Sequence, residues 1–186
     1  MYTLSEPVTL EEKSQKQVEF IPKVYGISVK KYNLVSIGAG GYAEQNLKAS
    51  NKIQIANTES NKLGVPLPKG TVRAFKEDEA DGSLEFIGED SIDHTPKDEN
   101  ITITTGNAFD ITANKIASNY QSYSNAGFSA DLNLTIWNHK SIDAEVVVEI
   151  SNYYGDNDKF SWKTVDLKVE RVSAQLFRIS RVFKAN

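Results

Sequence analysis

Apolar and polar residues alternate with a period of two along much of this chain, and no segment shows the sustained period of an amphipathic helix. The clearest alternation runs from Phe128 to Trp137, where every second side chain is apolar. Ala144 to Ile150 repeats the pattern after a polar turn. We expect these two runs to be antiparallel neighbours whose apolar faces share a core.

Shorter runs rich in β-branched and aromatic residues predict further strands. These runs are Tyr2–Leu10, Lys16–Ile21, Val24–Tyr32, Lys52–Asn57, Thr71–Lys76, Leu84–Ile87, Ile101–Thr105, Asp110–Ala117, Trp162–Val172 and Leu176–Phe183. Between Leu34 and Ser50 the pattern is lost around Gly38–Gly41, which predicts a mobile loop. The glycine spacing there does not fit a dinucleotide-binding fingerprint. The chain is therefore expected to be all-β.

The number and spacing of these short strands are typical of an antiparallel β-sandwich. The strands fall into two groups around Gly106 and Asn107, which predicts two packed β units. Residues 1–106 would form the first unit, and residues 107–186 have the size and strand spacing of an immunoglobulin-like sandwich. One continuous sandwich over the whole chain is the alternative that periodicity leaves open.

The strongest turn signal is Asp81–Gly82, which lies between the predicted strands Thr71–Lys76 and Leu84–Ile87. A tight hairpin turn needs positive backbone φ angles, and this dipeptide adopts them readily. We therefore expect a hairpin between these two strands, closed at Asp81–Gly82.

Several short motifs follow one another in and around the stretch from Gly64 to Ile111. They are Leu63–Gly70 (LGVPLPKG), Val72–Phe75 (VRAF), Phe86–Asp90 (FIGED), Ile92–Lys97 (IDHTPK) and Gly106–Asp110 (GNAFD). In this order they resemble the signature region of the C-terminal domain of unknown function found in mucoidy inhibitor A-like proteins. The resemblance covers this stretch most clearly, extends more weakly over most of the chain, and implies no reaction.

Members of that family usually carry an N-terminal domain and a helical segment before this region, and one more strand after it. The resemblance therefore implies that the chain is a fragment of a longer protein, whose other domains are its partners. It also implies a bacterial periplasmic, cell-surface or secreted setting. A link to surface polysaccharide is implied by the family's name alone.

Composition narrows the possible functions. The 21 basic and 25 acidic residues give a net charge of −4 without a basic cluster, so nucleic-acid binding is disfavoured. The chain has no cysteine, which excludes disulfides, thiolate metal sites and cysteine nucleophiles. No apolar run approaches the ~20 residues that span a bilayer, and the N-terminus lacks the basic start and apolar centre of a signal peptide.

Asp90, Asp93, His94 and Asp110 form the one cluster that could carry chemistry. A histidine among carboxylates can bind a metal ion or act as a general acid or base. The neighbouring residues favour turn capping, and no nucleophile completes a triad, so we expect no catalytic, metal or cofactor site here. Asp93, His94, Phe109 and Asp110 are instead predicted to form a structural junction. In it, Phe109 enters the core and both carboxylates accept backbone N–H bonds.

Tyrosines in polar segments predict a contact surface for a protein or a surface polysaccharide. These tyrosines are Tyr120, Tyr123, Tyr153 and Tyr154. Asp156–Asp158 offers oxygen ligands, but its spacing does not match a calcium-binding loop.

Two hypotheses of function follow. The first is a non-catalytic β-sandwich, an interaction or structural module of a larger bacterial envelope or secreted protein. The second is a polysaccharide-acting hydrolase or carbohydrate-binding module that uses carboxylates near Asp93 and Asp110. A glycosidase needs two carboxyl groups about 5–10 Å apart in an open cleft, which separates the two hypotheses.

Overall fold

The structure is a computed structural model that describes residues 7–19, 21, 23–40, 43–123, 127–152 and 167–186. The described residues form nine strands and one 3-10 turn, η1 (Glu59–Asn61). The strands are β1 (Val29–Gly38), β2 (Glu44–Ala56), β3 (Gly70–Glu77), β4 (Leu84–Ile92), β5 (Asn100–Ser122), β6 (Phe128–Asn138), β7 (Ala144–Ser151), β8 (Val169–Arg171) and β9 (Leu176–Phe183). The all-β prediction is confirmed. No helix in this described part is long and apolar enough to cross a membrane.

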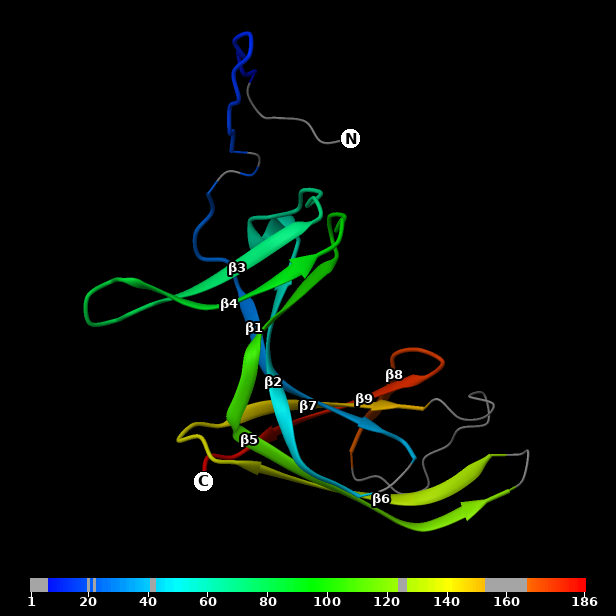
Figure 1. The fold of residues 1–186 in the computed structure, drawn as a ribbon. Coiled ribbons are helices and arrows are strands. Elements are labelled where there is room, and N and C mark those ends of the chain that lie inside the picture. The colour runs from blue at the N-terminus through cyan, green and yellow to red at the C-terminus, as the bar shows by residue number, and fades with distance from the viewer. Residues whose placement is uncertain (1–6, 20, 22, 41–42, 124–126, 153–166) are drawn as a thin grey trace.

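Seven strands form one sheet in the order β6-β5-β2-β1-β7-β9-β8, and β3 and β4 form a separate two-stranded sheet. The large sheet bends over, so that β5 and β6 form one layer and β7, β9 and β8 the other (Figure 1). Val146 and Ile150 of β7 pack in one buried cluster with Ile111 of β5 and Ile136 of β6. The two layers thus enclose a shared core, as in a β-sandwich.

β1, β2 and β5 continue beyond the sandwich, and the β3–β4 hairpin lies beside their far ends (Figure 1). A second, smaller core forms there around Ile101 and Ile103 of β5. Val72 and Ala74 of β3 and Ile92 of β4 pack against it. The long strands therefore carry both cores.

The expected boundary at Gly106 lies inside β5, which runs through it from Asn100 to Ser122. Gly106 does not end a strand; it has a φ of 116° and sits where the pairing of β2 with β5 shifts between Ser50 and Lys52. A glycine with positive φ at such a shift is typical of a β-bulge. The bulge leaves the strand continuous, so the sheet does not divide at Gly106.

The expectation that Phe128–Trp137 and Ala144–Ile150 are neighbouring strands is wrong. β6 pairs with β5, and β7 pairs with β1 and β9. The turn between them crosses from one layer to the other (Figure 1). Their apolar faces therefore pack in the same core, although the two strands are not hydrogen-bonded to each other. The sheet is also not wholly antiparallel, because β1 and β7 run parallel, with Val35 opposite Val148.

The hairpin prediction is confirmed: β3 and β4 are antiparallel, with Glu77 opposite Leu84. Gly82 has a φ of 73°, whereas Asp81 is not among the residues with positive φ. The connection spans residues 78–83, held by hydrogen bonds from the Gly82 N–H to the Asp78 carbonyl and from the Asp78 N–H to the Ser83 carbonyl. The turn is therefore longer than a two-residue hairpin turn.

Other strand predictions were met in part. The predicted loop over Leu34–Ser50 holds the end of β1 and the start of β2. Residues 7–19 form no strand, and β1 begins only at Val29. Within Trp162–Val172 the described strand is β8, and residues 162–166 lie outside the described part, as do residues 1–6.

Candidate functional site

The turn after β4 places Asp93 and His94 beside Lys69 at the surface. Asp93 Oδ1 lies 2.9 Å from Lys69 Nζ, and both side chains are more than half exposed. The hydrogen bond and the charge of Lys69 lower the pKa of Asp93. The backbone N–H of Lys69 donates to His94 Nδ1 at 3.3 Å. Next to this pair, Leu67 and Thr95 exchange backbone hydrogen bonds of 2.8 and 3.0 Å, so the PLPKG and IDHTP segments are joined by a short ladder.

Asn57 is fully buried beneath these two segments. Its side-chain amide donates to the carbonyls of Val65 and Pro96, both at 2.8 Å, and its Oδ1 accepts the N–H of Gly64 at 3.0 Å. One side chain therefore fixes both loops. The sequence pattern predicted only that Asn57 ends a strand. The signal for this role was an asparagine at that strand end, followed by polar residues that favour turns.

Asn61, in η1, holds the residues just before β1 in a similar way. It is buried, and its amide donates to the carbonyls of Ser28 and Ala56, both at 3.0 Å. Its Oδ1 accepts the backbone N–H of Ser28 at 2.6 Å. Because the two bonds to Ser28 join residues 33 positions apart, Asn61 ties the entry to β1 onto the loop after β2.

Asp90 connects β4 to β5. Its Oδ2 accepts the N–H of Thr104 at 2.8 Å, and its Oδ1 accepts the N–H of Ser91 at 2.8 Å. These two backbone donors lower the pKa of Asp90, because they favour the ionised carboxylate, and the N–H of Thr104 has the larger effect. Beside this bond, a Cβ atom on Gly88 would lie 2.7 Å from the Cα of Thr105. The hairpin thus contacts the long strand backbone to backbone.

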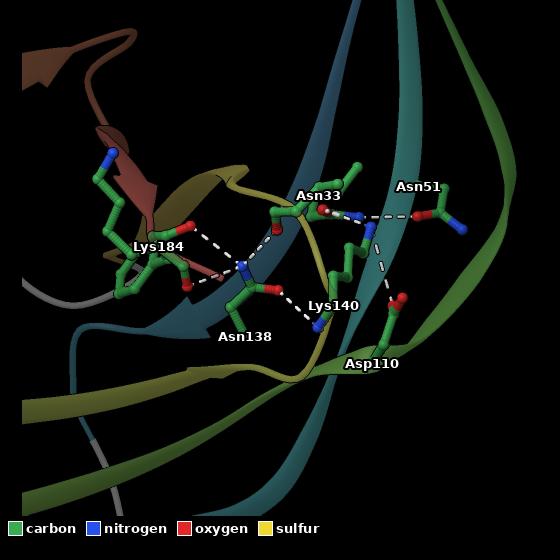
Figure 2. A network of polar contacts seen from close by, with 8 residues as sticks. Asn33, Asn51, Asp110, Asn138, Lys140 and Lys184 are labelled. Carbon is green, nitrogen blue, oxygen red and sulfur yellow. Dashed lines mark hydrogen bonds and ion pairs between the residues drawn. The ribbon is translucent and has the colours of Figure 1, made fainter. Parts of the chain in front are cut away.

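Asp110 belongs to a different network, in which Lys140 is the central residue (Figure 2). Lys140 Nζ lies 3.8 Å from Asp110 Oδ1 and 3.3 Å from Asn33 Oδ1. Asn33 is buried and donates to Asn51 Oδ1 at 2.7 Å. The turn between β6 and β7 is in this way attached to β1, β2 and β5.

Asn138, at the end of β6, completes this network (Figure 2). Its buried amide nitrogen lies 3.0 Å from the Ile142 carbonyl, 3.1 Å from the Phe183 carbonyl and 3.0 Å from the Lys184 carbonyl. Its Oδ1 accepts the N–H of Lys140 at 3.0 Å. The turn that carries the chain between the two layers is therefore fixed to the end of β9.

The contacts of Asp93, Phe109 and Asp110 differ from those predicted for the structural junction. Asp93 and Asp110 each contact a lysine, and in the described residues neither carboxylate accepts a backbone N–H bond. Of the three aspartates in the predicted ionisable cluster, Asp90 is the one that does. The expectation that Phe109 enters the core is wrong, because it is 83% exposed, with Lys48 Nζ 5.9 Å from its ring. A shift in the pairing of β2 and β5 lets Ala108 and Ile111 take the inward positions on either side of Phe109 and Asp110.

The predicted cluster of ionisable residues does not form one site. Asp90 contacts β5, Asp93 and His94 contact Lys69, and Asp110 contacts Lys140. Across the described ranges, no three residues of the histidine, cysteine, aspartate and glutamate types lie close enough together to hold a metal ion.

Tyr120 and Tyr123 lie near the end of β5, where both are at least half exposed. The Tyr120 ring stacks on Phe128 with centroids 5.5 Å apart. The Tyr123 hydroxyl lies 3.0 Å from Gln121 Oε1 and 3.1 Å from Ser129 Oγ. Tyr153 and Tyr154, the other members of the predicted contact surface, lie outside the described residues.

Among the described residues, Lys115 is the largest fully buried side chain, and the sequence pattern did not indicate it. Its Nζ donates to the carbonyls of Gly38 and Gly40, both at 3.0 Å, and to Glu44 Oε1. These three acceptors match the three protons of an ammonium group. The lysine therefore joins β5 to the end of β1 and the start of β2. The alternation of apolar and polar residues around position 115 does not predict a buried lysine.

The outer face of the β3–β4 hairpin exposes apolar side chains. Phe75 and Phe86 lie directly opposite each other, 50% and 56% exposed, with ring centroids 5.7 Å apart at an angle of 67°. Leu84 is 67% exposed two residues further along the same face. The pairing shifts between Ala74 and Phe75, so Ala74 faces the small core while the phenylalanines face away from it.

A scan against protein-family models, a search of curated proteins and a search of solved structures found no match to this chain.

Proposed function

We propose that this chain is a non-catalytic β-sandwich module that acts through protein contacts in a larger bacterial envelope or secreted protein. The proposal includes an immunoglobulin-like arrangement of the two-layered part and the resemblance to the C-terminal domain of mucoidy inhibitor A-like proteins. Under it, the long strands β1, β2 and β5 act as a rigid support, and the β3–β4 hairpin presents the contact surface.

The observation that carries the proposal is the exposed Phe75–Phe86 pair. Phenylalanine is among the residues most often buried, and aromatic residues are enriched at the centres of protein interfaces. Here two of them lie edge to face on a hairpin whose loop end projects from the molecule (Figure 1). A projecting pair of this kind can enter a pocket on a partner as an anchor.

The use made of the polar side chains supports the non-catalytic part of the proposal. The side-chain amides of three buried asparagines donate hydrogen bonds to backbone carbonyls of neighbouring segments; these are Asn57, Asn61 and Asn138. Asp90 and Lys115 likewise form hydrogen bonds with backbone atoms of other strands. These groups stabilise loops and strand ends, which is the role expected of buried hydrogen-bonded side chains in a structural module.

The alternative of a polysaccharide-acting hydrolase has less support. Asp93 and Asp110 are held by different lysines, Lys69 and Lys140, and neither contacts the other. Carbohydrate binding without catalysis keeps one supporting observation, the exposed Tyr120 ring stacked on Phe128, because sugar rings bind to flat aromatic faces. Titration with bacterial polysaccharides, compared between the unaltered chain and Tyr120→Ala, tests it; equal binding or none contradicts it.

Site-specific photo-crosslinking in the producing cells tests the main proposal. A photoreactive phenylalanine analogue replaces either Phe86 or Phe109. Phe109 is also highly exposed but has no aromatic partner among the described residues in an edge-to-face pair. We expect discrete crosslinked products from position 86 and none from position 109. Equal products from the two positions, or none from position 86, would contradict a contact role for the hairpin.

A further inference from the structure

The exposed phenylalanines of the hairpin are surrounded by negative charge. Residues 76–85 carry five acidic residues and one lysine, a net charge of −4. The acidic residues are Glu77, Asp78, Glu79, Asp81 and Glu85. In the described part of the chain, none of them forms an ion pair with a basic side chain. We call residues 75–86 the hairpin tip; its partner should be apolar and positively charged.

A surface of that kind lies on the same chain around Tyr25, which is 69% exposed. Lys23 Nζ lies 5.0 Å from the centre of the Tyr25 ring, and Lys62 Nζ donates to the Tyr25 carbonyl at 2.7 Å. Neither lysine forms an ion pair with a carboxylate of the described residues. One ammonium group therefore lies over the exposed ring, and a second contacts the backbone of the same residue. We call Lys23, Tyr25 and Lys62 the Tyr25 surface.

We propose that the hairpin tip of one copy of this chain binds the Tyr25 surface of a second copy. Phe75 and Phe86 would contact the Tyr25 ring, and the acidic residues of the tip would lie near the two lysines. This inference rests on the proposed function and names the partner. Because the two surfaces differ, the contact is heterologous, and successive copies form a ring or an open chain.

Charge argues against the other arrangements of the same surfaces. Two hairpin tips placed against each other would bring a net charge of −4 against −4, which opposes a symmetric dimer through the tips. An anionic lipid or phosphate surface would be repelled for the same reason. The loop end of the hairpin also projects away from the rest of its own chain, which places it for contact with another molecule (Figure 1).

Sedimentation velocity over a range of protein concentrations tests the proposal. The unaltered chain should associate at about 0.05 M salt. At about 0.5 M salt its dissociation constant should be at least about tenfold higher, because screening weakens contacts between exposed charges. A tip variant, Phe75→Ser with Phe86→Ser, and a surface variant, Lys23→Glu with Lys62→Glu, should each stay monomeric. Phe109→Ser, which removes another exposed phenylalanine, is the matched control and should associate like the unaltered chain.

Mixing the two variants gives the sharpest result. The tip variant keeps an intact Tyr25 surface, and the surface variant keeps an intact tip, so the mixture should form a one-to-one complex and nothing larger. Thermal melts followed by circular dichroism establish that both variants are folded. Should the serine variant unfold, Glu77→Lys with Glu79→Lys replaces it, because these side chains are exposed and only the charge changes.

An unaltered chain that stays monomeric at every concentration, association that survives in the tip variant, or a mixture without a complex would each overturn the proposal. These failures are distinct from failure of the proposed function. A crosslink from position 86 to a different protein would overturn the second-copy partner and leave the contact role of the hairpin in place.

Discussion

Gly88 of β4 and Thr105 of β5 lie so close that a Cβ atom on Gly88 would sit 2.7 Å from the Cα of Thr105 and 3.0 Å from its carbonyl oxygen. Both obstacles are backbone atoms, so no side-chain rotation can relieve the contact. The φ of Gly88, 153°, is also one that residues with a Cβ rarely adopt. The hairpin can approach the long strand only because position 88 has no side chain.

Gly88→Ala should therefore lower the free energy of unfolding by about 1–3 kcal/mol, the usual cost of overpacking a closely packed site. Urea denaturation followed by fluorescence measures the change. Gly70→Ala in β3 is the matched control, because a Cβ atom there would meet nothing within 4 Å. Equal midpoints for the two variants would show that β4 does not lie against β5 in this way.

Asn57→Ala should destabilise the junction of the PLPKG and IDHTP segments. The substitution leaves the Gly64 N–H and the carbonyls of Val65 and Pro96 without their partner. A buried polar group that loses its partner costs about 1–3 kcal/mol, so we expect a loss of at least about 2 kcal/mol. Hydrogen exchange should show faster exchange at Gly64 in particular. Ser60→Ala, at an exposed position of the same loop, should leave stability and exchange unchanged.

Local chemistry made part of this structure predictable, and distant contacts decided the rest. Asp81–Gly82 carries its turn signal in two adjacent residues, and the hairpin follows from it. The alternation from Phe128 to Trp137 identified β6 but not its partner, because periodicity gives the buried face of a strand and not its neighbour.

The candidate site shows the same division. Phe109 was assigned to the core because it lies between Ala108 and Asp110, but with the shifted pairing of β2 and β5 Ala108 is buried and Phe109 faces outward. A bulge is set by the partner strand, so the sequence of β5 alone could not reveal it. The roles of Asn57 and Lys115 were missed for a related reason: their acceptors are backbone carbonyls of other segments, which leave no mark in the sequence.

Asp90 and Asp93 should differ in how they couple stability to pH. In the folded chain the pKa of Asp90 is lowered by the N–H groups of Thr104 and Ser91. Its contribution is therefore fully present above the ordinary aspartate pKa near 4 and is lost as the pH falls through the lower folded pKa. Asp90→Asn should remove this part of the acid-induced loss of stability and cost about 1 kcal/mol at neutral pH.

The pKa of Asp93 is also lowered, by the hydrogen bond and charge of Lys69, but this ion pair is exposed. Exposed pairs contribute little and are screened by salt. Asp93→Asn should therefore leave the melting temperature unchanged at moderate salt, measured by calorimetry between acid and neutral pH. A larger effect for Asp93→Asn than for Asp90→Asn would reverse our assignment of the carboxylate that supports the fold.

Asn138→Asp provides the most specific test of the turn that joins the two layers. The amide nitrogen of Asn138 faces three carbonyl oxygens, from Ile142, Phe183 and Lys184 (Figure 2). A carboxylate has the same shape but no proton to donate, so it would place a negative charge against these oxygens in a buried site. We expect a loss of about 3 kcal/mol at neutral pH, because one carboxylate oxygen would keep the N–H of Lys140 while the other would face three acceptors, and an unmet charged group costs more than a neutral one.

The pH dependence of this variant separates lost donation from a simple change of packing. Burial among acceptors raises the pKa of the new carboxyl group above its unfolded value. The protonated form can donate one hydrogen bond again, so the stability deficit of Asn138→Asp should shrink as the pH falls through this raised folded pKa. Asn133→Asp, the same substitution at an exposed position of β6, should show neither the deficit nor its recovery in urea titrations at each pH. A deficit of the same size at acidic and neutral pH would mean that Asn138 acts by shape and not by donating to the end of β9.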